Sequence, residues 1–187
     1  MVNYIISGCP RSGTSMLMRI LHNAGFPIAK DEKRKADRDN VHGYFEVHNI
    51  INKLKDNPEL VFEYDNKALK VTHFGLQYLP EREEGGYRII YVERDMEEVL
   101  DSMEKMMGQS DEEREETRQA FLKFDRKVRE LMDERKDIEH MIVSHRKLVK
   151  DPEPEIDRIT GFYGIKPSKK DAMLKAIDPE SYRNRRS

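Results

Sequence analysis

The stretch NYIISGCPRSGTSMLMRILHNAG, residues 3–25, decides the fold of this 187-residue chain. It opens with the apolar run NYIIS (3–7), which is followed by Gly8 as a buried parallel strand would be. The segment after the loop is amphipathic and ends at Gly25, and its apolar residues share one helical face: Met16, Leu17, Ile20 and Leu21. The sequence therefore predicts a strand, a tight loop and a helix in direct succession.

The loop between this strand and this helix has the composition of an anion-binding turn. A glycine-rich turn at a helix start points several backbone N–H groups at one spot, where the helix dipole adds partial positive charge. Gly8 and Gly13 permit the tight backbone, and Thr14 and Ser15 offer hydroxyl donors. Arg11 carries a forked donor that can hold two oxygens of a phosphate or sulfate. We therefore predict that the loop binds a phosphate group.

This loop departs from the nucleoside-triphosphate P-loop at one residue. That signature reads G-x-x-x-x-G-K-[ST], and the glycines and Ser15 fit it, but Thr14 occupies the lysine position. In P-loop enzymes that lysine bridges the β- and γ-phosphates. Its absence disfavours a P-loop kinase of small molecules or nucleotides, which is the first alternative function.

Strand and helix patterns alternate along the rest of the chain. Further strands are expected at residues 67–74, 87–94 and 141–148. Helices are expected at residues 47–55, 96–107, 116–136 and 153–164. This alternation predicts an α/β fold, a P-loop-type three-layer sandwich with a mainly parallel central sheet flanked by helices. We expect residues 1–187 to form a single domain.

The loop sequence PRSGTSML (10–17) resembles the 5′-phosphosulfate loop of the sulfotransferases, in which P-[KR]-S-G-T-[ST] replaces the triphosphate loop. That family uses 3′-phosphoadenosine 5′-phosphosulfate (PAPS) as donor, needs no metal and releases 3′,5′-adenosine bisphosphate (PAP). The resemblance implies a catalytic role for Arg11, which would neutralise charge on the bridging oxygen. It also implies a set of donor-binding loop residues: Pro10, Arg11, Ser12, Gly13, Thr14 and Ser15.

A second family signature is a strand that ends in arginine and is followed eight residues later by a serine, the two holding the 3′-phosphate. The sequence supplies both, with Arg94 at the end of an expected strand and Ser102 in the next helix. Ser102 would lie two turns into a helix that begins near Met96, close to that arginine. The segment IDPESYRNRR (177–186) resembles a basic tail that closes over the nucleotide in some members, which implies Arg183 as a further ligand.

Sulfuryl transfer also requires a base that takes the acceptor's proton, and two residues are candidates. His73 in LKVTH is similar to the histidine base of cytosolic sulfotransferases, and Glu46 in GYFE resembles the catalytic glutamate of other branches. Lys70, the candidate catalytic lysine, stands three residues before His73 instead of two. In a regular strand the two would point to opposite faces, so a bulge or the end of the strand must lie between them if both act.

Composition excludes several other functions. A net charge of -2 argues against broad nucleic-acid binding. No apolar run approaches the roughly 20 residues that span a bilayer. The single cysteine, Cys9, cannot form an internal disulfide, and a cytoplasmic location is expected. The histidines have no metal-ligand spacing with this cysteine, so no metal is expected.

The leading hypothesis is a PAPS-dependent sulfotransferase that sulfates a hydroxyl or amine by in-line transfer. The expected acceptor is a small molecule or a carbohydrate, in a pocket built mostly by residues 26–66 and 107–136. Besides the kinase, an alternative from another class is a non-catalytic nucleotide-binding domain that kept the loop and lost the base.

Overall fold

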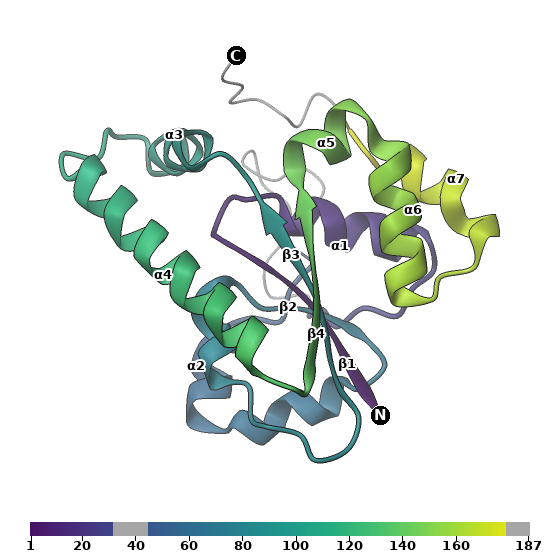
Figure 1. Cartoon of the computed structure of the whole chain (residues 1–187). Helices are drawn as coiled ribbons and strands as arrows, with labels where there is room; N and C mark the ends of the chain where they lie inside the picture. Colours follow the sequence, from purple (N-terminus) through teal and green to yellow (C-terminus); the bar gives the residue numbers. More distant parts are fainter. Residues whose placement is uncertain (32–44, 179–187) are drawn as a thin grey trace.

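The computed structural model of the chain describes residues 1–31 and 45–178. Within these residues four strands form one sheet in the order β2-β1-β3-β4, and every pair of neighbours is parallel (Figure 1). The strands are β1 (Val2–Gly8), β2 (Ala68–Lys70), β3 (Gly86–Glu93) and β4 (Ile138–Ser144). The predicted α/β fold with a parallel sheet is confirmed.

The register of the sheet brings the ends of three strands to the first loop. In β1, Ile6 pairs with Lys70 of β2 on one side and with Ile90 of β3 on the other. Because the strands are parallel, their carboxyl ends share one edge, where ligands of open α/β sheets bind. The loop after β1 therefore lies between the segments that follow β2 and β3.

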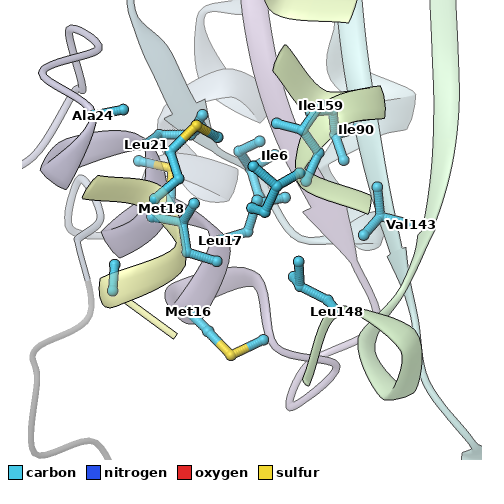
Figure 2. Close-up of a cluster of buried hydrophobic side chains, with 14 of the residues drawn as sticks. Ile6, Met16, Leu17, Met18, Leu21, Ala24, Ile90, Val143, Leu148 and Ile159 are labelled. Carbon is cyan, nitrogen blue, oxygen red and sulfur yellow. The ribbon is translucent and has the colours of Figure 1, made fainter. Parts of the chain in front are cut away.

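Helices cover both faces of the sheet (Figure 1). One buried cluster joins Ile6 and Ile90 to side chains of α1 (Thr14–Asn23), α5 (His145–Lys150), α6 (Pro152–Tyr163) and α7 (Lys170–Lys175). Figure 2 shows Leu17 of α1 and Ile159 of α6 meeting Ile6 in this cluster.

The other face of the sheet carries a second buried cluster. It joins Ile5 and Ile89 to side chains of α2 (Ile50–Asp56) and α4 (Arg114–Glu134). Alternate residues of each strand thus enter opposite clusters, as the period of a strand requires. Three 3-10 helices complete the described elements: η1 (Pro58–Tyr64), η2 (His73–Tyr78) and η3 (Pro167–Lys169).

The ends of two predicted strands were wrong. The strand expected over 67–74 ends at Lys70, because the chain leaves the sheet and enters η2 with Thr72 at its N-cap. The strand expected over 141–148 occupies Ile138–Ser144 instead. Ser144 is the N-cap of α5, where its side chain accepts a hydrogen bond from the N–H of Lys147, and this capping ends the strand.

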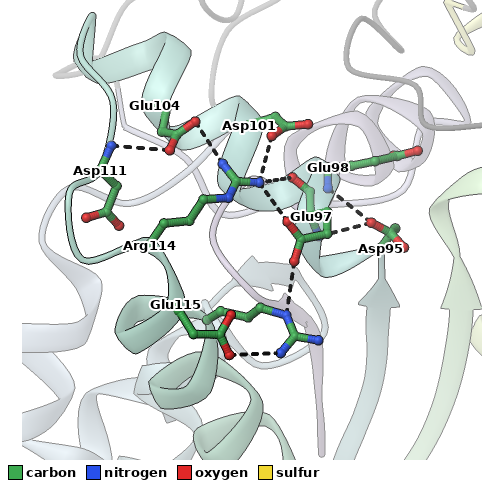
Figure 3. A network of polar contacts seen from close by, with 9 residues as sticks. Asp95, Glu97, Glu98, Asp101, Glu104, Asp111, Arg114 and Glu115 are labelled. Carbon is green, nitrogen blue, oxygen red and sulfur yellow. Dashed lines mark hydrogen bonds and ion pairs between the residues drawn. The ribbon is translucent and has the colours of Figure 1, made fainter.

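Helix α3 (Met96–Met107) follows β3 and is fixed at both ends by charged groups (Figure 3). At its start the side chain of Asp95 accepts hydrogen bonds from the N–H groups of Glu97 and Glu98. Arg114 at the beginning of α4 forms ion pairs of 2.7–2.8 Å with three carboxylates of α3: Glu97, Asp101 and Glu104. These contacts hold α3, which carries Ser102, against α4.

No helix within residues 1–31 and 45–178 is both long enough and apolar enough to cross a membrane.

Candidate active site

The loop after β1 has room only for glycine at its two glycine positions. Gly8 has φ 147°, and a Cβ there would lie 2.5 Å from the carbonyl oxygen of Val92. Gly13 has φ 109°, and its Cβ would lie 2.4 Å from Cδ2 of His145. Both separations are far below van der Waals contact, and both φ values favour glycine. The loop is therefore packed directly against the end of β3 and the start of α5.

Arg11 connects the loop to α3 and to the end of β3. Its backbone is left-handed, with φ 69°, and its Nε donates a hydrogen bond of 3.1 Å to Oγ of Ser102. The carbonyl oxygen of Arg11 accepts a hydrogen bond of 3.1 Å from Nη1 of Arg94, and Nε of Arg94 pairs with Glu98 at 3.0 Å. The loop is thus in direct contact with Arg94 and Ser102, the two residues that were predicted to act with it.

Ser12 has the clearest sign of a missing partner in the loop. Its side chain is 1% exposed, and Oγ has no hydrogen-bond partner among the described residues. A buried hydroxyl without a partner costs about 1–3 kcal/mol. An anion held by the loop would supply the acceptor that this hydroxyl lacks.

On the β2 side of the loop, Lys70 connects two candidate residues. Its Nζ donates a hydrogen bond of 3.1 Å to Oγ of Ser15 and forms an ion pair with Glu46. The side chain of Lys70 is 6% exposed and that of Glu46 is 18% exposed. The structure therefore brings Glu46 to the loop through Lys70.

His73 lies in an aromatic cluster between η2 and α4. Its side chain is fully buried, and its ring packs at 4.1–5.9 Å between centroids against Phe74, Phe121 and Phe124. Its Nδ1 lies 3.4 Å from the hydroxyl of Tyr91, and its Nε2 has no partner within residues 1–31 and 45–178. Burial lowers the pKa of His73 to about 4, so the ring is neutral at pH 7.

Acid should destabilise the protein through this buried ring. The pKa of His73 is about 4 in the folded protein and 6.5 for an unperturbed histidine, as in the unfolded chain. Between pH 4 and 6.5 the unfolded state therefore binds more protons than the folded state. The stability that the neutral ring contributes is fully present above pH 6.5 and is lost as the pH falls toward 4. Between pH 7 and 5 we expect His73 to account for a loss of about 2 kcal/mol of unfolding free energy. Urea unfolding of wild type and His73→Gln at both pH values measures this; an equal loss in the variant would contradict it.

A cavity of about 420 Å³ lies beside the loop at the carboxyl ends of β3 and β4. Its lining includes Cys9, Tyr91, Arg94, Glu98 and Asp125. Burial raises the pKa of the Cys9 thiol to about 12, with a further contribution from Asp125, so the thiol is protonated and not a nucleophile at pH 7.

Some predicted residues lie outside the described chain. Arg183 is one, and so are residues 32–44 of the 26–66 segment that was expected to build part of the acceptor pocket. Among the residues that the structure does describe, no group of three or more His, Cys, Asp or Glu side chains could hold a metal ion.

Three contacts of the site were missed by the sequence analysis. His145 packs its ring over Gly13. The Tyr91 hydroxyl donates to Asp125 at 2.5 Å, and Asp31 contacts the backbone of Glu46 and of His48. Each of these contacts joins residues that are far apart in the sequence or that lie in irregular backbone, so no local sequence pattern indicates it.

Comparisons with known proteins agree with this geometry. Residues 3–187 match a family model described as "Sulfotransferase domain". The sulfotransferase domain of the Synechococcus PCC 7002 olefin synthase has a similar structure, with a TM-score of 0.56 and 13% identity over 98% of this chain and 79% of that one. The sulfotransferase domain from the curacin biosynthetic pathway is also similar, with a TM-score of 0.54 and 12% identity over 95% of this chain and 78% of that one. At such identities the likeness shows the fold alone.

A mouse sulfotransferase, SULT7A1, solved in complex with PAP, is also similar in structure. Its TM-score is 0.51 at 16% identity, over 94% of this chain. The chain spans only 63% of the length of this mouse protein. No curated protein sequence gives a significant match.

Proposed function

The chain belongs to the sulfotransferase domain family, whose members transfer sulfuryl groups from PAPS, and we propose that it uses Glu46 as the base that activates a hydroxyl or amine acceptor. One observation carries this proposal. Lys70 contacts both Ser15 of the phosphate loop and the carboxylate of Glu46. A base must lie within reach of the reacting atoms, and of the two candidates only Glu46 is joined to the loop in this way.

The donor site combines the loop with Arg94, which follows β3, and with Ser102 of α3. The backbone N–H groups of the loop and the Arg11 guanidinium would hold the 5′-phosphosulfate, and the hydroxyl of Ser12 gains an acceptor there. Arg94 and Ser102 would hold the 3′-phosphate, which their contacts of 3.1 Å with Arg11 support. By resemblance, Arg183 is a further ligand of that phosphate.

The transfer step follows from these positions. The acceptor oxygen or nitrogen attacks sulfur and forms the new bond as the bond from sulfur to the 5′-phosphate oxygen breaks. Glu46 takes the proton from the acceptor, and PAP leaves with the bridging oxygen. Lys70 and Arg11 neutralise the charge that grows on this oxygen, which is how fixed cations lower such a barrier.

His73 is the weaker candidate for the base in this arrangement. Its side chain is 0% exposed and enclosed by aromatic rings, whereas the side chain of Glu46 is 18% exposed. A substrate hydroxyl would have to displace the aromatic cluster to reach Nε2. We therefore assign the buried histidine to the core.

Transfer of radiolabel tests the proposed reaction. The protein is incubated with ³⁵S-labelled PAPS and a panel of a phenol, a primary alcohol, an aminosugar and water, once with chelator and once without it. We expect label in at least one product and equal rates with and without chelator. Transfer of ³²P from γ-labelled ATP in magnesium, with no transfer of ³⁵S, would instead support the kinase alternative.

A further inference from the structure

Glu46 lies in a stretch of irregular backbone between residue 45 and the start of α2 at Ile50. Two non-glycine residues of this stretch have left-handed backbone, Phe45 with φ 47° and Asn49 with φ 54°. Such conformations are unfavourable for residues with a Cβ and persist when surrounding contacts hold them. The position of the Glu46 carboxylate therefore depends on what holds this backbone.

Asp31 contacts the backbone of Glu46 and of His48. Its backbone N–H donates a hydrogen bond of 3.1 Å to the carbonyl oxygen of Glu46. Its carboxylate Oδ2 accepts a hydrogen bond of 2.8 Å from the N–H of His48. A single residue thus binds backbone groups immediately before and after Val47.

The segment that carries Asp31 is itself attached to β2. Ile28 forms a parallel bridge with Ala68, and the N–H of Ala29 donates to the carbonyl oxygen of Ala68 at 2.8 Å. The N–H of Ala68 in turn donates to Pro27 at 2.8 Å. Strand β2 also carries Lys70, which pairs with the Glu46 side chain. The side chain and the backbone of Glu46 are therefore held from the same strand by two separate routes.

We propose that Asp31 is a positioning residue that holds Glu46 against Lys70 and so orients the base. The inference rests on the proposed role of Glu46. Asp31 acts through the hydrogen bond that its side-chain oxygen accepts from the N–H of His48. An asparagine at this position keeps an oxygen acceptor, whereas an alanine removes it.

The test measures release of ³⁵S-sulfate from labelled PAPS with water as acceptor, together with calorimetric affinity for PAP. For Asp31→Ala we expect kcat to fall about 10-fold, because small displacements of a catalytic group cost this much or more. KM for PAPS and the affinity for PAP should stay within about twofold of wild type, because the donor contacts are on other elements. Asp31→Asn should recover most of kcat. Equal losses in both variants, or no loss in Asp31→Ala, would overturn the proposal.

Glu46→Gln and the double variant separate this inference from the base assignment. If Asp31 acts through Glu46, then Asp31→Ala should cost little further in the Glu46→Gln background. If the losses in kcat of the two single variants added fully in the double variant, Asp31 would act elsewhere. The positioning role would then be wrong, and the base assignment would stand. Wild-type turnover in Glu46→Gln would end the base assignment and the positioning role together. If Asp31→Ala loses PAP affinity because it misfolds, Asp31→Asn and Asp31→Glu are compared instead. We expect a higher kcat for Asp31→Asn, and a higher kcat for Asp31→Glu would contradict the proposal.

Discussion

Glu46→Gln should lower kcat for sulfuryl transfer by about 10²–10³-fold, the range expected when a general base is removed. Glutamine has the size of glutamate but cannot accept the acceptor's proton, and it also loses the ion pair with Lys70. Donor binding should be nearly unchanged, because the 3′-phosphate residues and the loop are intact. The measurement is steady-state transfer from ³⁵S-labelled PAPS, with affinity for PAP determined in parallel.

Two control variants make this result specific. Glu63→Gln changes an exposed glutamate of η1 and should leave kcat at the wild-type value. His73→Gln should lower kcat per folded molecule by less than about fivefold, since the ring is fully buried among aromatic side chains. A large loss in His73→Gln with none in Glu46→Gln would make His73 the base.

Gly13→Ala should damage both stability and donor binding. The added Cβ would lie 2.4 Å from Cδ2 of His145, whose side chain is buried and has little room to move. The φ of 109° adds backbone strain for any residue with a Cβ. We expect a loss of about 2–4 kcal/mol of unfolding free energy and at least a tenfold weaker affinity for PAP, because the first N–H groups of α1 would be displaced. Urea unfolding and calorimetry measure the two effects.

The matched control for Gly13→Ala is Gly161→Ala in the interior of α6. A Cβ there meets nothing within 4 Å, so this change should stabilise the protein by about 0.5–1 kcal/mol. In a His145→Ala background, Gly13→Ala should lower the unfolding free energy only by the backbone strain that a φ of 109° imposes on a residue with a Cβ. Equal costs of Gly13→Ala in both backgrounds would contradict the steric explanation.

The contact of the loop with Arg94 and Ser102 was predictable from sequence because the residues lie in local patterns that follow strands of a parallel sheet. The loop follows β1, and Arg94 follows β3, which pairs directly with β1. Parallel pairing alone then brings Arg94 and Ser102 to Arg11. The pattern of apolar residues was enough to predict the two strands that matter.

The surroundings of the two candidate bases were not predictable in the same way. The burial of His73 depends on Phe121 and Phe124, which lie in a helix about 50 residues further along the chain. The strand before it ends at Lys70 because of a 3-10 helix that propensity did not reveal. The contact of Asp31 with Glu46 is made in irregular backbone, where neither the strand nor the helix period applies.

Calorimetric titration with PAP tests the central claim, a metal-independent bisphosphate site made by the loop, Arg94 and Ser102 of α3. We expect binding of PAP that is equal in magnesium and in chelator, and no comparable binding of ATP. Arg94→Ala should weaken PAP binding by about 100-fold or more, the cost of removing a buried charged partner of a phosphate. Arg88→Ala, in strand β3 at an exposed ion pair with Glu139, should leave it unchanged. Magnesium-dependent binding of ATP, with no PAP binding to the wild-type protein, would contradict the account.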